Sequence, residues 1–405
     1  MSNSDYLNSF PKDTTDAWRN RVERELKGKS YEDFLIWKSN EGFEIEAWQN
    51  SRPSPLPRLI APSDPWKIIE PIYSTDAQEA NKLALAALNV GAEAVWFQKS
   101  FLGAASQVAS QGIDKGIAPV FIRNGNITNP FQSLLKSGQS NDTESEETTF
   151  YLDGNRLRER GAGVIDELAI LLSQAIELGR KTNFEKQPLF VSGIGNAFLT
   201  EVAKLRALRW LWLSILQKEG KTPQNASILA KNLTIGYALN DEHTNILRAT
   251  SSAMSSAIGG AQYVMIEPWD RSWKDQNTFS SRISRNIQNL LKEEARLDKN
   301  LNPADGSYLI ENLTVKIAKL AWAKVNEIES KGGFTEYALS GQLKSGLNKS
   351  RAQIIDSYEK NRSILVGVNK FQSSEMKTET KRSSSHYELL PDLMEIPFAL
   401  QNQQS

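Results

Sequence analysis

The chain has 405 residues, of which 24% are charged, and its 48 lysines and arginines are balanced by 48 aspartates and glutamates. A neutral chain has no global field that draws it onto nucleic acid or an anionic membrane, and no local basic patch in the sequence replaces one. The chain has no cysteine, which excludes disulfides, thiolate nucleophiles and cysteine-ligated metals, and only His243 and His386 are available for imidazole chemistry.

No stretch approaches the roughly 18 apolar residues that a membrane-spanning helix needs. The N-terminal MSNSDYLNSF also lacks the basic and then apolar pattern of a signal peptide. These features predict a cytoplasmic protein with no membrane partner. At this length the chain can bury a sizeable core.

Residues 1–63 are predicted to form an N-terminal arm with little core of its own. The stretch DAWRNRVERELKG predicts a short amphipathic helix that ends at Gly28. The stretch RPSPLPRLIAP has four prolines, which favour extended backbone without strand pairing. Such a segment usually lies on a folded surface, of this chain or of a partner, so we expect the arm to make a subunit contact.

Residues 64–332 alternate between short β-prone runs and amphipathic helices. The runs are WKIIEPIY, AEAVWF, IAPVFI, TFYL, PLFVSG, NLTIGYAL, AQYVMI and GSYLIE. Regular alternation of this kind means parallel pairing, and about eight units over 65–330 match the size of a closed (β/α)₈ barrel. The alternative is an open doubly wound sheet, but no unit carries a dinucleotide fingerprint. The sequence therefore predicts an α/β fold of the TIM-barrel type.

Three further segments fall outside the barrel pattern. Residues 137–148 are polar and acidic, which predicts a solvated insertion. Residues 333–372 are expected to form a helical extension, and 373–405 a linker followed by an apolar C-terminal tail.

One candidate site is the stretch DGNRLRERGAG, residues 153–163, which carries Arg156, Arg158 and Arg160. It lies between a predicted strand and the helix that begins near Val164, at the face where barrel enzymes hold their active sites. Arginines there can bind a phosphate or a carboxylate. The alternative is an ion-paired loop or a subunit contact, for which arginine is equally suited.

A second candidate is Asp241-Glu242-His243, which resembles the start of the cobalamin-binding signature D-x-H-x-x-G. Ile246 stands where that signature requires glycine, and barrel-like units continue beyond it. We therefore interpret His243 as an ordinary loop or helix-start residue. His386 lies in the polar tail, where a solvated side chain is expected.

Several blocks together resemble the adenosylcobalamin-dependent methylmalonyl-CoA mutase family. They are RATSSAMSSAIGGAQYV, FSSRISRNIQNLLKEEARL, NPADGSYLIENLT, AKLAWAKVNEIESKGGF and ILVGVNKF, in the family's order and spacing. The resemblance spans nearly the whole chain to about Phe371 and implies a barrel independently of periodicity. The N-terminal arm and the end of the chain look most like the small (β) subunits of heterodimeric members, which have no cobalamin-binding domain.

The resemblance also shows departures at the family's catalytic positions. Aligned on Glu159, Gly161 and Ala162, Arg156 takes the place of a substrate-contacting histidine. Arginine stays charged and cannot replace a neutral imidazole. Glu70 and Pro71 take the places of the glutamine and the tyrosine in the family's P-W-x-I-R-Q-Y block.

These departures imply that the chain has no catalytic, cofactor-binding or metal-binding residues, with Arg156, Glu70 and Pro71 as degenerate positions. The implied function is that of a non-catalytic subunit that stabilises a large (α) subunit. That partner would carry adenosylcobalamin and interconvert methylmalonyl-CoA and succinyl-CoA. Alternatives are a catalytic barrel that works with a separate cobalamin-binding chain, and a module that holds a CoA ester. An isolated chain would expose its interface and could form a homo-oligomer.

Overall fold

The computed structural model describes residues 14–39, 43–53, 59–60, 62–122, 127–129, 131, 149–238 and 241–372. The predicted insertion at 137–148 and the predicted linker and tail at 373–405 lie outside these residues. Within the described ranges, no helix combines the length and the apolar character needed to span a membrane.

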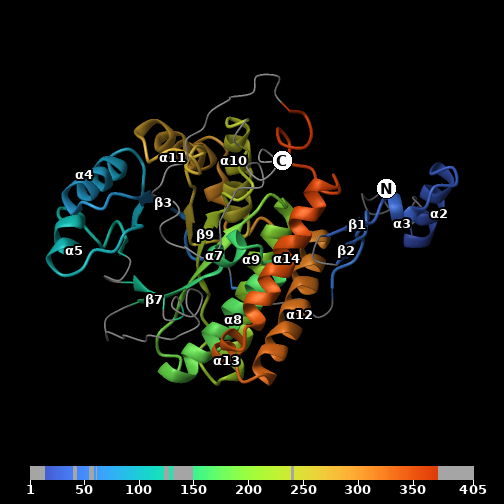
Figure 1. The fold of residues 1–405 in the computed structure, drawn as a ribbon. Coiled ribbons are helices and arrows are strands. Elements are labelled where there is room, and N and C mark those ends of the chain that lie inside the picture. The colour runs from blue at the N-terminus through green and yellow to red at the C-terminus, as the bar shows by residue number, and fades with distance from the viewer. Residues whose placement is uncertain are drawn as a thin grey trace, which may run out of the picture.

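The centre of the fold is a curled sheet of eight parallel strands (Figure 1). They are β3 (Lys67–Ile72), β4 (Ala94–Phe97), β5 (Val120–Ile122), β6 (Ile127–Thr128), β7 (Thr149–Asp153), β8 (Leu189–Ile194), β9 (Ser227–Asn232) and β10 (Tyr263–Met265). Their order is β5-β4-β3-β10-β9-β8-β7-β6, so the last strand pairs with the first, as in a TIM barrel. The predicted α/β fold of the TIM type is confirmed in part, because within the described residues β5 and β6 are the two ends of the curled sheet and the predicted closure is not seen.

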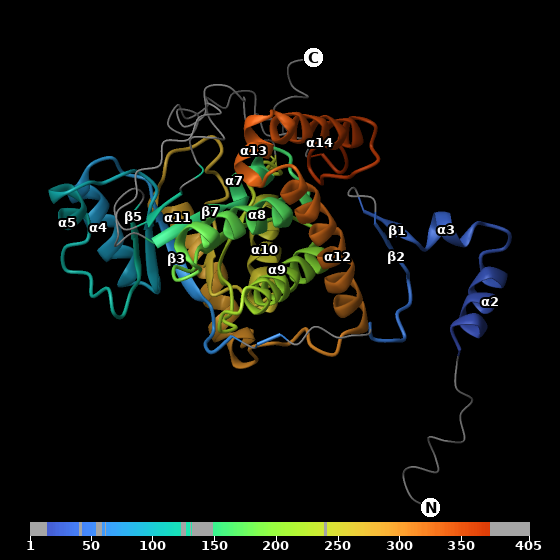
Figure 2. The same cartoon turned by 90° about the horizontal axis from the view of Figure 1, so that it is seen from below.

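Helices surround this sheet (Figure 2). Around the barrel they are α4 (Ala77–Leu88), α5 (Ala104–Ala109), α7 (Gly154–Glu159), α8 (Val164–Thr182), α9 (Phe198–Lys218), α10 (Thr244–Ile258), α11 (Thr278–Glu293) and α12 (Tyr308–Ser330). A short 3₁₀ helix, Leu297–Lys299, precedes α12, and α13 (Phe334–Leu339) and α14 (Gln342–Glu359) follow it.

The main core lies between the sheet and the long helices. Apolar residues of α8 at helical spacing, among them Leu168, Leu172 and Ala175, are fully buried there. The helix runs past Gly179 and ends at Thr182. At Gly179 a Cβ atom would collide with the ring of Phe184, so glycine permits the close packing of the chain that turns back. A smaller core lies between α4, α5 and strands β3–β5.

The prediction that the run GSYLIE forms the eighth strand is wrong. Residues 306–311 instead contain the start of α12, where the Ser307 side chain accepts a hydrogen bond from the Ile310 N–H. The Glu311 carboxylate also accepts one from the Gly306 N–H at 2.8 Å. These caps satisfy backbone donors that a strand would have paired with a neighbour.

The run NLTIGYAL is also displaced, because the strand ends at Asn232 where that run begins. Residues 233–238 form a loop with a turn in which the Tyr237 N–H donates to the Thr234 carbonyl. The Glu159 carboxylate accepts the Thr234 and Ile235 N–H groups at 2.6 and 3.0 Å. Side-chain acceptors thus replace a neighbouring strand for this apolar stretch.

The N-terminal segment begins with α2 (Thr15–Glu25), which agrees with the predicted short helix, and continues with α3 (Tyr31–Phe34). An antiparallel pair, β1 (Trp37–Lys38) and β2 (Glu44–Ile45), follows. Both views place α2 and α3 away from the barrel (Figures 1 and 2). In contrast, the buried Phe43 belongs to the main core.

Candidate functional site

The interior of the curled sheet is filled by aromatic side chains. Trp96 of β4 stacks on Phe121 of β5, with ring centroids 5.4 Å apart, and meets the Tyr151 ring edge-on at 5.5 Å. Phe121 in turn contacts Tyr263 at 5.3 Å. Because side chains alternate along a strand, these rings point inward while their neighbours join the outer cores. They occupy the space along the barrel axis.

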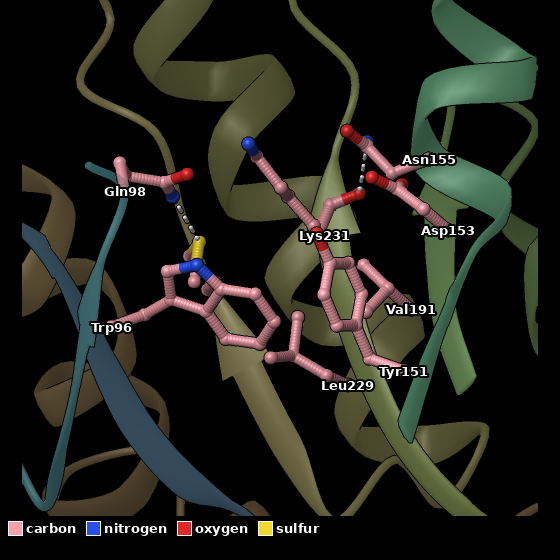
Figure 3. Close-up of a pocket in the computed structure, with 9 residues that line it drawn as sticks. Trp96, Gln98, Tyr151, Asp153, Asn155, Val191, Leu229 and Lys231 are labelled. Carbon is pink, nitrogen blue, oxygen red and sulfur yellow. Dashed lines mark hydrogen bonds between the residues drawn. The ribbon is translucent and has the colours of Figure 1, made fainter. Parts of the chain in front are cut away.

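Above this aromatic cluster a small cavity opens toward the carboxyl ends of the strands (Figure 3). Its lining residues are Trp96, Gln98, Tyr151, Asp153, Asn155, Val191, Leu229, Lys231 and Met265. Its volume is about 30 Å³. That space holds roughly one or two water molecules, whereas small-molecule pockets usually measure roughly 300–1,000 Å³.

The polar side of the cavity is held by a buried ion pair. The Lys231 ammonium lies 2.8 Å from the Glu267 carboxylate, which also accepts a short hydrogen bond from the Tyr73 hydroxyl. Burial alone would raise the pKa of Glu267, but Lys231 and these hydrogen bonds outweigh it and hold that pKa below its usual range. The positive charge of Lys231 is therefore balanced by the Glu267 carboxylate of the same chain.

Strand β7 ends at Asp153, and α7 begins directly after it with Gly154, Asn155 and Arg156. The Asp153 carboxylate accepts a hydrogen bond from the Arg156 N–H at 2.9 Å and caps the helix. The Asn155 amide donates to the Lys231 carbonyl at 3.4 Å. Arg156 lies in the last turn of α7 and is half-buried.

Arg158 is held by carboxylates inside the protein. Its guanidinium lies 3.0 Å from Glu201 and 3.6 Å from Glu167, and it also donates to the Ala162 carbonyl at 3.0 Å. Its side chain is only 12% exposed. Arg160 is buried as well. Arg158 is therefore ion-paired within the protein, as one interpretation of the arginine stretch expected, but it lies in the short helix α7 and not in a loop.

A second cation completes a four-charge cluster behind Arg158. The ammonium of Lys204, which is fully buried, lies 2.8 Å from Glu167 and 2.6 Å from Glu201. The Glu167 carboxylate also accepts the Ser192 hydroxyl and the Gly193 N–H, each at 2.8 Å. Two carboxylates and two cations cancel, so the cluster joins α7, α8, α9 and β8 with no net charge.

Glu70 and Pro71, the other two positions that the resemblance implies are degenerate, lie on β3. Glu70 pairs with Arg285 of α11 at 2.7 Å, both side chains being 7% exposed, and so faces the outer helix. Burial raises the pKa of Glu70 to about 7 in spite of Arg285. The Pro71 carbonyl accepts a hydrogen bond from the Gln276 amide at 2.8 Å. Glu70 therefore does not face the cavity that Asp153 and Asn155 line.

His243 is exposed and immediately precedes α10, which agrees with its interpretation as a helix-start residue. Its ring packs against Trp269 with centroids 5.1 Å apart. His386 lies outside the described residues. Across the described ranges, no group of three or more histidine or acidic side chains is arranged to hold a metal ion.

Sequence reasoning did not identify the residues that dominate this site. Trp96 lies on β4, Gln98 directly follows that strand and Lys231 lies on β9, and none of them belongs to a recognisable motif. One signal was available, because polar residues directly after predicted strands gather at one end of a parallel barrel.

Comparison with known proteins shows the family. The family model for methylmalonyl-CoA mutase matches residues 142–389, which is more than half of the chain. The chain belongs to the methylmalonyl-CoA mutase family. The resemblance recognised in the sequence blocks is thereby confirmed.

Among members of the mutase family, the chain is similar to the methylmalonyl-CoA mutase small subunit of Porphyromonas gingivalis. The two are 28% identical over 90% of this chain and 71% of the relative. It is 34% identical to the Cereibacter sphaeroides mutase, over 55% of this chain and 33% of the relative. The human mitochondrial mutase is 32% identical over 55% of this chain and 31% of the relative. The chain therefore spans about a third of those two mutases, and most of the length of the small subunit.

Proposed function

We propose that this chain is a non-catalytic small subunit that binds and stabilises a catalytic large subunit of methylmalonyl-CoA mutase. The large subunit would interconvert methylmalonyl-CoA and succinyl-CoA. The observation that carries the proposal is the aromatic filling of the barrel interior, above which the described residues enclose a cavity of about 30 Å³. A catalytic barrel of this fold needs a cavity at the carboxyl ends of its strands that can hold the substrate and exclude water from it.

The mouth residues do not fit adenosylcobalamin, so we propose that this cofactor binds only the large subunit. Adenosylcobalamin would need a broad open surface at the mouth of the barrel, whereas the rings of Trp96 and Tyr151 fill that space. His243 packs against Trp269, whose ring also lies under the Lys274 ammonium, and the helix that follows His243 has isoleucine at position 246, where the cobalamin-binding signature needs glycine. The same filling counts against the alternative of a catalytic barrel that works with a separate cobalamin-binding chain.

The inactivity of this chain is tested by assaying it alone and in complex. Purified full-length chain with adenosylcobalamin and methylmalonyl-CoA should give no succinyl-CoA above background. The same assay with the large subunit encoded in the same genome provides the positive control. Turnover by the chain alone, in proportion to its concentration, would refute the non-catalytic assignment.

The subunit role is tested by association. Co-expressed large subunit should co-purify with the full-length chain and should melt at a higher temperature in the complex, because a partner that binds only the folded state stabilises it. A chain that lacks residues 1–38 should lose most of this association. An intact complex with the truncated chain would exclude the N-terminal segment from the interface.

A further inference from the structure

The N-terminal segment has a small aromatic core of its own. The Trp18 ring of α2 lies 5.2 Å from the Trp48 ring and 6.0 Å from the Tyr31 ring, measured between centroids. The Arg19 guanidinium lies over the Tyr31 ring at 4.5 Å. Contacts among large rings contribute more than their buried area alone. These residues hold α2 and α3 in a defined arrangement before any partner arrives.

Hydrogen bonds join this aromatic core to the strand that returns to the barrel. The Tyr31 hydroxyl donates to the Glu46 carboxylate at 3.0 Å. Further along, the Asn312 amide of α12 donates to the Gln49 side chain at 3.0 Å and to the Ser51 carbonyl at 2.9 Å. The described residues from 14 to 51 are called the bracket here. The bracket is fixed to α12 at its C-terminal end.

The outer part of the bracket exposes two large aromatic side chains. Phe34 is 58% exposed and Trp37 is 48% exposed. Trp37 lies with its ring edge-on to Phe43, 6.3 Å between centroids, and Phe43 is anchored in the main core. Aromatic residues that stand rigidly on the surface are the side chains most often responsible for binding energy at protein interfaces.

The Lys29 ammonium lies over the Phe34 ring at 4.8 Å, and three other basic groups of the segment are paired within it. Arg19 lies 2.5 Å from Glu32, Arg21 lies 2.7 Å from Glu25, and Lys38 lies 3.8 Å from Glu44. A nucleic acid or an anionic lipid surface would require unpaired basic groups. The chemistry that suits this surface is therefore an apolar pocket on another protein.

We propose that Phe34 and Trp37 are the anchor residues through which the preformed N-terminal bracket docks on the catalytic large subunit. This inference rests on the proposed function, which supplies the partner. Both residues belong to a segment that lies away from the barrel (Figure 2), and the described part of this chain leaves about half of each side chain exposed. Because the bracket is folded in advance, little ordering entropy is lost on binding.

The test compares two full-length variants in a titration with the purified large subunit. F34S/W37S should raise the dissociation constant about thirtyfold or more, the effect expected for interface anchors. The control I117S removes a side chain that is 75% exposed ahead of β5, remote from α2 and α3, and should change it less than about threefold. A third variant, W18A, keeps both rings but disrupts the bracket's core, and should weaken binding to an intermediate extent.

The outcomes separate this inference from the proposed function. If the wild-type chain does not bind the large subunit, the proposed function fails. If it binds and F34S/W37S binds equally well, with a melting temperature close to the wild type, the anchor assignment fails and the subunit role stands. If the double substitution abolishes only self-association of the isolated chain, measured by sedimentation, the rings contact a second copy and the inference is wrong.

Discussion

At the residue scale, the arginines of residues 153–163 show that a pattern typical of an anion-binding site can instead stabilise the fold. Arg158 shares Glu167 and Glu201 with Lys204, all four within one neutral cluster. Removing a single member of such a cluster leaves a buried charge without compensation, which costs much more than the intact pair contributes. Lys204 is the most sensitive member, because its side chain is fully buried.

We predict that Lys204→Met lowers the free energy of unfolding by about 3–5 kcal/mol. The matched control is Arg180→Met, which breaks the Arg180–Glu329 pair on the surface, where the arginine side chain is 57% exposed. That change should cost less than about 1 kcal/mol. Urea denaturation of both variants measures the difference, and equal costs would contradict a structural role for the cluster.

The buried Glu70–Arg285 pair predicts a pH dependence of stability. Because burial raises the pKa of Glu70 to about 7, the folded state keeps a proton that the unfolded state releases from about pH 4.5 upward. Stability from this group is therefore present at low pH and is lost as the pH rises to 7. Relative to Glu70→Gln, the wild type should lose about 1–3 kcal/mol as the pH rises from 5 through 7, and the loss should level off above about pH 8. Parallel curves for the two proteins would show that Glu70 does not titrate in this range.

The sequence identifies Arg156, Glu70 and Pro71 as candidate departures from the family pattern, because each stands in a block that resembles the family. Their contacts could not be predicted in the same way. The pairing of Arg158 with Glu201 depends on bringing α7 against α9, and that of Glu70 with Arg285 on bringing β3 against α11. Such pairings require the three-dimensional arrangement.

At the element scale, long periodic segments were predicted well and short apolar runs were not. The apolar stripe of α8 extends over five turns, which leaves no competing assignment. GSYLIE is six residues long, and its apolar residues fit the first turn of a helix as well as a strand. Strand β6 has only two residues, too few to give any alternation. The length of an apolar pattern therefore determined whether its helix or strand was predicted correctly.

The aromatic filling of the barrel predicts a cavity that can be engineered. Trp96→Ala should remove the largest ring from the interior and lower the free energy of unfolding by about 3–5 kcal/mol. Indole should then bind in the vacated space and raise the melting temperature of the variant, with no effect on the wild type. If indole leaves the variant's melting temperature unchanged, the interior has collapsed around the substitution.

At the scale of the whole molecule, the outer bracket contributes little to the stability of the barrel. No residue of α2 is buried, whereas Phe43, a few residues after β1, lies in the main core. Removal of residues 1–38 should therefore shift the melting temperature by less than about 3 °C, whereas Phe43→Ala should cost about 3 kcal/mol. Calorimetry measures both. A large shift on truncation would mean that the bracket supports the barrel directly.

The pairing of β10 with β3 has a consequence for synthesis of the protein. The two strands meet through Tyr263 and Lys67, so one edge of β3 has no native neighbour until about two hundred further residues have been made. At about 5–20 residues per second this interval lasts roughly 10–40 s. An unpaired apolar strand invites aggregation during that time. Newly made chains should therefore depend on chaperones until β10 emerges from the ribosome.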